Sequence, residues 1–374
     1  MKSEVYALSE LVILFDKKRI PLSAMERVKR SGSYRYYGAQ GVIDYIDDYI
    51  FDGQYMLIAE DGENLKSNKQ NIAQLVSGRF WLNNHAHIVQ CNEKANMTLL
   101  CYYLNHTDLS GYITGSAQPK LSQTNLNAIT VRLPSRTIQD RIASIIDSID
   151  GKIASNTQIN HNLEQQALTL FRSWFINFEP FSEDGTMPSL WSTGYVSDII
   201  ELHDSRRIPL SGSERDKMEK VYPYYGATSL MDYVDNYLFD GIYLLLGEDG
   251  TVIDSLGFPI LQYVDGKFWV NNHAHILTGK RGYSVEELYL FFRLTNIRSI
   301  VTGAVQQKVS QANLKKVPAV LPPEDCLHAF DELIQPLFAQ IRNLRNESNR
   351  LTQLRDALLP KLMSGELDVS EVDI

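Results

Sequence analysis

The feature that most constrains the fold is an internal repeat that covers most of the chain. Residues 15–134 align without insertion to residues 203–322, and about 50 of these 120 positions are identical. The longest matches pair Arg19–Ser23 with Arg207–Ser211, and Phe80–Ile88 with Phe268–Ile276. A unit of this length is a whole domain and too long for a solenoid repeat. The sequence therefore predicts two copies of one domain, each followed by a connector.

Composition places the chain among folded globular proteins. Of its 374 residues, 44% are hydrophobic and 22% are charged, which is close to the average for soluble domains. No apolar run approaches the roughly 20 residues that span a bilayer, and the first residues lack a signal-peptide pattern. The three cysteines are an odd number and have no metal-finger spacing. We therefore expect a reduced, cytoplasmic protein.

Each repeat shows a mainly β pattern that ends in a helical stretch. In the first repeat, the apolar run Tyr55–Ala59 lies between two Asp-Gly pairs, which indicates a strand between turns. Period-two alternation over Trp81–Ile88 predicts a further strand, with His85 and His87 on one face. Helical patterns follow near residues 96–105 and 285–293. Together with the connectors, these elements predict an α+β fold with two duplicated, β-rich α/β domains.

Both connectors carry the heptad pattern of a coiled coil. The seam positions of the first are Ile142, Ile146, Ile149, Ile153, Asn156, Asn160, Leu163, Ala167, Leu170 and Trp174. Those of the second are Phe330, Ile334, Leu337, Ile341, Leu344, Ser348, Leu351, Arg355, Leu358 and Leu362. Matched phase and length favour two long helices that pair antiparallel, in a register where paired positions sum to 504. The alternative is two independent helices that each pack on their own domain.

These patterns define six segments. We expect domains at 1–134 and 189–322, long helices at 135–178 and 323–365, a linker at 179–188, and an acidic tail at 366–374. The net charge of −9 taken alone argues against a nucleic-acid binder. However, residues 323–374 hold 10 acidic and only 5 basic side chains, whereas residues 1–134 hold 13 and 14. The acidity therefore lies mainly outside the repeated domains.

Each repeat opens with a cluster that mixes basic side chains and tyrosines. Cations beside flat polar rings are suited to holding phosphates and contacting base edges. Arg19 and Arg207 occupy equivalent positions, and we expect each to contact a guanine or a phosphate. The predicted DNA-binding residues are Lys17, Lys18, Arg19, Lys29, Arg30, Arg35, Tyr36, Tyr37 and Lys120 in the first copy, and Arg206, Arg207, Arg215, Lys217, Tyr224, Tyr225 and Lys308 in the second.

Metal chemistry is the main alternative. The pairs His85/His87 and His273/His275 would place two imidazoles on one strand face, where a nearby carboxylate could complete a metal site. No third ligand stands at a telling spacing, so histidines hydrogen-bonded inside the domain are the simpler interpretation. The sequence contains no phosphate-binding loop, dinucleotide fingerprint or nucleophile elbow. It therefore predicts a chain without catalytic residues.

Two segments resemble a known family. Leu163–Ala167, Phe171–Phe175 and Phe178–Phe181 are similar to the central conserved region of type I restriction–modification specificity subunits. Leu354–Leu367 resembles the C-terminal conserved helix of the same subunits. The resemblance covers essentially the whole chain and implies two target-recognition domains held apart by an antiparallel helix pair.

The resemblance also implies partners and cofactors. Partners would be double-stranded DNA, two methyltransferase subunits that use S-adenosylmethionine, and restriction subunits that use ATP and Mg²⁺. No cofactor would be bound by this chain itself. Partner-binding positions would lie in the two similar segments, at Phe171, Trp174, Phe175, Leu359, Leu362 and Met363.

The sequence thus favours a non-catalytic specificity subunit that recognises a bipartite, interrupted DNA site. Because the repeats are alike and the helices are expected to be antiparallel, the two half-sites should be similar and inverted. Two alternatives remain open at this point. One is a tandem β-rich metalloenzyme that uses the His-x-His pairs, and the other is a coiled-coil scaffold without DNA contact.

Overall fold

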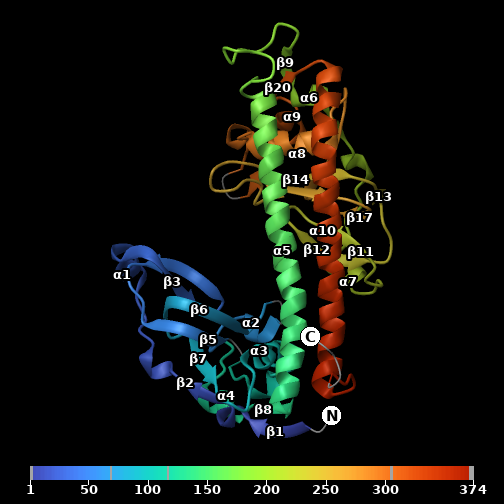
Figure 1. Cartoon of the computed structure of the whole chain (residues 1–374). Coiled ribbons are helices and arrows are strands. Elements are labelled where there is room, and N and C mark those ends of the chain that lie inside the picture. Colours follow the sequence, from blue (N-terminus) through green and yellow to red (C-terminus); the bar gives the residue numbers. More distant parts are fainter. Residues whose placement is uncertain (1–2, 68–69, 116–117, 304–305, 370–374) are drawn as a thin grey trace. The chain divides into compact units, whose positions relative to one another are not determined.

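The chain divides into two compact units, each of which contains one repeat. The computed structural model describes residues 3–67, 70–115, 118–303 and 306–369 (Figure 1). Unit 1 combines Met1–Ala154 with Ser348–Ile374, and unit 2 is Ser155–Glu347. Both long helices, α5 (Arg136–Phe175) and α10 (Glu324–Ser364), cross the boundary between the units. Each unit therefore holds a repeat, the beginning of the helix that follows it, and the end of the other helix.

Unit 1 is built on one six-stranded sheet, in the order β2-β7-β5-β6-β3-β4. The strands are β2 (Val12–Leu14), β3 (Ser31–Gly38), β4 (Gly41–Ile46), β5 (Phe51–Ala59), β6 (Ala73–Leu82) and β7 (Ala86–Cys91). β3 and β6 are parallel, and the other neighbours are antiparallel. β1 (Ser3–Ala7) pairs separately with β8 (Thr130–Pro134), which leads into α5.

Unit 2 repeats this arrangement with shorter strands. One sheet has the order β10-β18-β14-β16 and another the order β12-β11-β17-β13. Their strands are β10 (Ile200–Leu202), β11 (Tyr222–Tyr225), β12 (Leu230–Val234), β13 (Phe239–Asp240), β14 (Tyr243–Gly247), β16 (Leu261–Val264), β17 (Lys267–Val270) and β18 (Ala274–Gly279). Two further pairs are β9 (Ser192–Tyr195) with β20 (Pro318–Leu321), and β15 (Asp249–Gly250) with β19 (Gln307–Lys308).

The Asp-Gly pair at 52–53 differs from its prediction. It lies inside β5 rather than in a hairpin turn, because β5 continues from Phe51 to Ala59. Gly53 has a φ of 130° and its counterpart Gly241 a φ of 135°, which are values that favour glycine. In unit 2 the chain separates into β13 and β14 at this point. The glycine therefore lies inside a strand in unit 1, whereas in unit 2 it lies in the break between two strands.

Short helices fill the connections between strands. In unit 1 they are α1 (Ala24–Lys29), α2 (Asn64–Ser67), α3 (Met97–His106), α4 (Gln123–Ala128), η1 (Leu8–Glu10), η2 (Asp16–Lys18) and η3 (Ser110–Tyr112). In unit 2 they are α6 (Val196–Ile199), α7 (Gly212–Arg215), α8 (Val285–Leu294), α9 (Gln311–Leu314), η4 (Asp204–Arg206) and η5 (Arg298–Ile300). Side-chain caps start several of them, since Asn96 accepts from the Leu99 amide and Ser284 from the Glu287 amide.

Alternation along β5 builds a core on each face of the unit 1 sheet. Met56 and Ile58 pack with Ile142, Ile146 and Leu359 of the long helices. Leu57, which points the other way, packs with the aromatic rings of Phe51 and Phe80. The apolar positions predicted for the helix seam therefore bury one face of the sheet as well as each other.

Contacts inside each unit agree with the predicted antiparallel register. In unit 2, Asn156 donates to Glu347 (sum 503), and the Trp174 and Phe330 rings lie 5.3 Å apart (sum 504). In unit 1, Arg355 binds Asp150 (sum 505). A register with sum 504 would place Arg355 opposite the apolar Ile149, and the guanidinium instead binds the neighbouring carboxylate of Asp150.

The two long helices are continuous over 40 and 41 residues. Pro336 and Pro360 both lie within α10 and do not interrupt it. The acidic tail expected at 366–374 falls partly outside the described residues. Across the described part of the chain, none of the helices combines the length and the apolar character that crossing a membrane would need.

Candidate functional site: a duplicated charge network beneath an exposed turn

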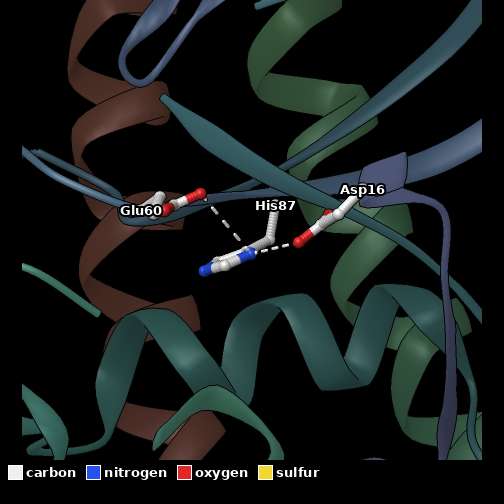
Figure 2. Close-up of side chains that lie close together, drawn as sticks. All are labelled: Asp16, Glu60 and His87. Atoms are coloured by element: carbon white, nitrogen blue, oxygen red, sulfur yellow. Dashed lines mark hydrogen bonds and ion pairs between the residues drawn. The ribbon is translucent and has the colours of Figure 1, made fainter. Parts of the chain in front are cut away.

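A buried histidine is the centre of a charge network in unit 1. Figure 2 shows His87 of β7 between Asp16 of η2 and Glu60, which follows β5. Nδ1 of His87 lies 2.6 Å from Asp16 Oδ2, and Nε2 lies 2.8 Å from the Leu121 carbonyl oxygen. Glu60 Oε2 is 3.9 Å from Nδ1. Since His87 is only 1% exposed, these partners replace water around the ring.

The partners of His87 determine its charge. The Leu121 carbonyl can only accept, so Nε2 donates to it. Burial alone would raise the pKa of Asp16, but the hydrogen bonds from His87 and the Ile88 amide and the Arg19 charge lower it below its ordinary value. Asp16 is therefore ionised at neutral pH and accepts from Nδ1. With both ring nitrogens donating, His87 is an imidazolium cation.

Arg19 and Lys120 complete the network. Arg19 NH1 donates to Glu60 Oε2 and to the Ala86 carbonyl, each at 2.8 Å, and Arg19 Nε donates to the Asp16 carbonyl at 3.0 Å. Lys120 Nζ lies 3.3 Å from Glu60 Oε1. Burial would raise the pKa of Glu60, but Arg19, His87 and Lys120 together lower it. Three cations thus surround two carboxylates, and the network joins η2, the β5 end, β7 and the segment before α4.

The second repeat contains the same network. His275 Nδ1 lies 2.6 Å from Asp204 Oδ2, and its Nε2 lies 2.7 Å from the Val309 carbonyl oxygen. Arg207 NH1 donates to Glu248 Oε2 at 2.6 Å, and Lys308 Nζ is 3.4 Å from Glu248 Oε1. The two copies share this geometry although many of their other residues differ. We therefore regard the charge network as part of the common fold of the repeats.

The network resembles a metal site in composition but not in its hydrogen bonds. Ligand-type atoms of Asp16, Glu60 and His87 lie within 4.8 Å of one another, as do those of Asp204, Glu248 and His275. However, both nitrogens of His87 already donate hydrogen bonds, so the ring offers no lone pair to a metal. Two further cations also offset the carboxylate charge. This chemistry fits an ion-pair network, and the metalloenzyme alternative has no support.

The predicted pairing of His85 with His87 on one strand face was wrong. β6 ends at Leu82 and β7 begins at Ala86, so residues 83–85 form a turn. His85 binds Asp61 and not the groups around His87, with 2.8 Å between Nδ1 and Oδ2. The two-residue spacing suggested a continuous strand, but the chain crosses the end of β5 at this point.

The turn is held firmly from below. The Asn83 side chain is buried, and its Oδ1 accepts from the His85 amide at 2.8 Å. The His85 carbonyl accepts from the Glu60 amide at 2.9 Å. Arg19 NH1 also donates to the Asn84 carbonyl at 3.4 Å. Arg19, predicted to touch DNA, is therefore bonded within the protein and has a side chain only 14% exposed.

Three of the tyrosines predicted to contact DNA belong to the core. Tyr36 and Tyr224 are each 1% exposed, and Tyr37 is 4% exposed. The Tyr36 hydroxyl accepts from the Leu22 amide at 2.8 Å, and the Tyr37 ring packs edge-on against Phe80. Rings buried in this way cannot stack on bases, so we remove these three from the predicted contacts. Tyr225 is half-buried.

Several predicted basic residues are already engaged with neighbouring groups. Arg30 lies over the Trp81 ring and binds Asp47. Arg215 lies over Tyr224 and pairs with Asp232. Arg35 donates to the Ser77 carbonyl, Arg206 to the Leu238 carbonyl, and Arg207 to Glu248. The exposed members of the predicted set are Lys17, Lys18, Lys29, Lys120, Arg206, Lys217 and Lys308.

Most of the predicted partner-binding residues are also buried within the chain. Phe171 and Phe175 pack with Phe330 in unit 2. Leu359 and Leu362 join the core of unit 1. These four therefore stabilise the units themselves, whereas Trp174 and Met363 remain partly exposed. The apolar heptad pattern did not distinguish contacts within the chain from contacts with a partner.

Comparisons with known proteins agree with this architecture. The family model "Type I restriction modification DNA specificity domain" matches residues 1–165 and 188–353. The MjaIX specificity subunit, a type I restriction enzyme subunit of Methanocaldococcus jannaschii, is 28% identical over 296 residues, which cover 71% of this chain and 66% of that protein. A Haemophilus influenzae protein, provisionally named as a type I restriction enzyme specificity subunit, is 24% identical over 336 residues, covering 84% and 82%.

A solved structure shows the same fold. The type I restriction–modification system S subunit from M. genitalium superposes with a TM-score of 0.59 at 15% identity and covers 96% of both chains. The family model matches one copy of the domain to each repeat and most of the chain overall. This chain therefore belongs to the family of type I restriction–modification DNA specificity proteins.

Proposed function

We propose that this chain is the subunit that gives a type I restriction–modification complex its DNA specificity, with each repeat binding one half of an interrupted duplex site. The observation that carries the proposal is the duplicated site itself. Both repeats build the same charge network and the same exposed turn, within a chain whose two domains match a DNA specificity family. Two equal surfaces on one chain are suited to two similar half-sites.

The composition of the units supports inverted rather than directly repeated half-sites. Unit 1 joins the beginning of α5 to the end of α10, and unit 2 joins the beginning of α10 to the end of α5. The contacts inside both units are antiparallel. Such reciprocal exchange is the pattern that a two-fold relation produces. We therefore expect the two halves of the site to be related by inversion.

Partners supply the chemistry in this proposal. We propose that two methyltransferase subunits, which use S-adenosylmethionine, modify an adenine in each half-site. Restriction subunits that use ATP and Mg²⁺ would cleave unmodified DNA. Support comes from the names of the relatives, which are subunits of type I restriction enzymes. The half-exposed Trp174 and Met363 remain the candidates for partner contacts on the two helices.

Mapping methylated adenines in genomic DNA tests the proposal. Cells with the chain and its methyltransferase should modify one interrupted, nearly palindromic motif, and cells without the chain should not. A sharper form replaces residues 203–322 by residues 15–134, which align without insertion. The motif should then become a perfect interrupted palindrome. Two half-sites that share no bases after inversion would contradict the symmetry, and unchanged methylation without the chain would contradict the function.

A further inference from the structure

An exposed histidine–carboxylate pair occupies the same place in both repeats. The His85 and His273 side chains are 51% and 46% exposed, although the residues that follow them, Ala86 and Ala274, are buried. His85 Nδ1 lies 2.8 Å from Asp61 Oδ2, and His273 Nδ1 lies 2.5 Å from Asp249 Oδ1. Within the described residues, the protein bonds each ring only through Nδ1. Nε2 is left for a ligand from outside.

Stability does not account for the retention of this pair. Ion pairs at such exposure contribute about 0–1 kcal/mol. Two exposed positions nearby have diverged, with Gln40 replaced by Thr228 and Glu63 by Thr251. In contrast, Asp61, Asn84 and His85 recur unchanged as Asp249, Asn272 and His273. A surface pair that survives while its surroundings change points to a shared ligand, and the sugar–phosphate backbone is the part of DNA that does not vary with sequence.

The turn presents the imidazole in a fixed orientation. The same asparagine contact holds both turns, because the His85 amide donates to Asn83 and the His273 amide to Asn271, each at 2.8 Å. Arg19 supports the Asn84 carbonyl, and Arg207 supports the Asn272 carbonyl at 3.3 Å. The buried network therefore acts beneath the turn, and its arginines are positioning residues.

Basic side chains border the pair. Main-chain pairing places Asp61 beside Lys120, and Asp249 beside Lys308, and both lysines are exposed. The segment that supplies Arg19 also carries the exposed Lys17 and Lys18, and its counterpart carries Arg206. The carboxylates nearby are Asp61 itself and Glu60, whose oxygens already bind Arg19 and Lys120. An incoming phosphate thus meets cations around the histidine.

We infer that His85 and His273 each donate Nε2–H to a DNA phosphate, while Asp61 and Asp249 hold the rings in place. This inference rests on the proposed function, since it assigns a contact within the same DNA interface. With the carboxylate accepting from Nδ1, Nε2 carries a hydrogen only in the imidazolium form. The contact therefore requires the protonated ring, and it neutralises about one phosphate per repeat.

The test measures binding of the full chain to duplex DNA by fluorescence anisotropy. One probe is a duplex that contains the motif identified by mapping methylated adenines. The other is a duplex of unrelated sequence. For the double variant His85→Ala/His273→Ala, we expect affinity for both probes to fall about tenfold at pH 6 and little at pH 8. The slope of log affinity against log salt should decrease by about 2 at pH 6, since each lost phosphate contact removes about 0.9.

Two further variants separate a DNA contact from a structural effect. His161→Ala removes an exposed histidine of α5 that lies outside the site, and it should leave affinity, salt slope and pH dependence unchanged. Asp61→Asn/Asp249→Asn keeps the rings but removes the carboxylates that hold them in place, so it should weaken binding less than the loss of both histidines. Unfolding midpoints of all variants report whether the turn has collapsed.

The outcomes distinguish this inference from the function beneath it. If the wild-type chain binds the motif and the double histidine variant keeps its affinity, salt slope and pH dependence, the phosphate contact is overturned and the specificity function stands. Equal losses at pH 6 and pH 8 would also overturn it, because a structural effect would not follow the charge of the ring. If the wild-type chain shows no preference for the motif at any pH, the result contradicts the proposed function, and the phosphate contact with it.

Discussion

The two repeats agree at the charge network and the exposed turn above it, and they differ where they meet the long helices. In unit 2 the junction is filled by aromatic rings, with Phe338 of α10 lying 5.3 Å from Tyr263 and 5.9 Å from Tyr289. The equivalent positions in unit 1 are Asp150, Leu75 and Cys101. These line a hollow of about 550 Å³ together with charged residues of α5 and α10.

Polar contacts differ in the same way. In unit 2, Arg342 donates to Glu286 at 2.9 Å and to the Tyr263 hydroxyl, so the charge is enclosed by packing. In unit 1, Arg355 binds Asp150 at 2.7 Å beside the hollow. The comparison shows that the exposed turn is nearly the same in both repeats. The contacts with the long helices, in contrast, use different residues in each repeat. The first repeat should therefore be held against its long-helix segments less firmly than the second repeat is.

The largest expected effect comes from the aromatic junction. Phe338→Ala should destabilise unit 2 by about 3–5 kcal/mol, because it removes a buried ring from a packed cluster. The matched variant at the equivalent position, Asp150→Ala, should cost less than about 1 kcal/mol, since it removes a half-exposed ion pair. Hydrogen exchange followed by mass spectrometry reports the opening of each unit separately. Equal costs for the two variants would contradict the difference drawn between the junctions.

The charge network should give matched effects instead. Asp16→Asn and Asp204→Asn each leave a buried imidazolium without its carboxylate, which should cost about 2–3 kcal/mol in the respective unit. Hydrogen exchange in the two units again provides the measurement. Clearly different free-energy costs for the two variants would show that the networks, although alike in geometry, contribute differently to stability.

Acid should weaken both units in parallel. The pKa values of Asp16 and Asp204 lie below their ordinary value of 3.8, since hydrogen bonds from the histidines outweigh burial. Their stabilisation is therefore fully present above about pH 4 and is lost as the pH falls through the lowered pKa. Denaturant unfolding from pH 5 downward should show this loss, and the two Asn variants should show less of it.

A smaller effect distinguishes one buried position. Glu287 of α8 occupies the place of Leu99 in α3, and burial raises its pKa to about 8. A raised pKa means that this carboxyl favours folding below its ordinary value of 4.5 and disfavours it progressively up to pH 8. Glu287→Leu should therefore stabilise unit 2 by about 1–2 kcal/mol at pH 8 and change little at pH 5. A wild-type unit 2 whose stability does not change over this range would contradict the assignment.

Much of the fold follows from the sequence because repetition and periodicity are properties of residue order. The alignment of the two copies indicates duplicated domains, and the heptads of both connectors predict α5 and α10 together with their register. Partner choice was harder to predict. The family resemblance placed Phe171 and Leu359 among the partner contacts, and only packing shows that they lie inside the units.

The site was less predictable because its groups meet through the fold. Arg19 and Glu60 are 41 residues apart, and nothing between them indicates that they form an ion pair. Residue type also led to a wrong prediction. Tyr36 has a ring that could stack on a base, but it is buried. One signal was available: Asp61 and His85 recur identically in both copies, and identity at positions that later prove to be exposed is a useful marker of function.

The composition of unit 1 has a consequence for its synthesis on the ribosome. Leu359, Leu362 and Val369 complete a core whose other buried members lie before residue 147, so the first repeat cannot finish folding until α10 has emerged. About 200 residues must be translated in between, which takes roughly 10–40 s at 5–20 residues per second. During that interval the early seam residues Ile142 and Ile146 lack part of their cover. The first domain to be made is thus the last to be completed, and this face of α5 stays partly uncovered until then.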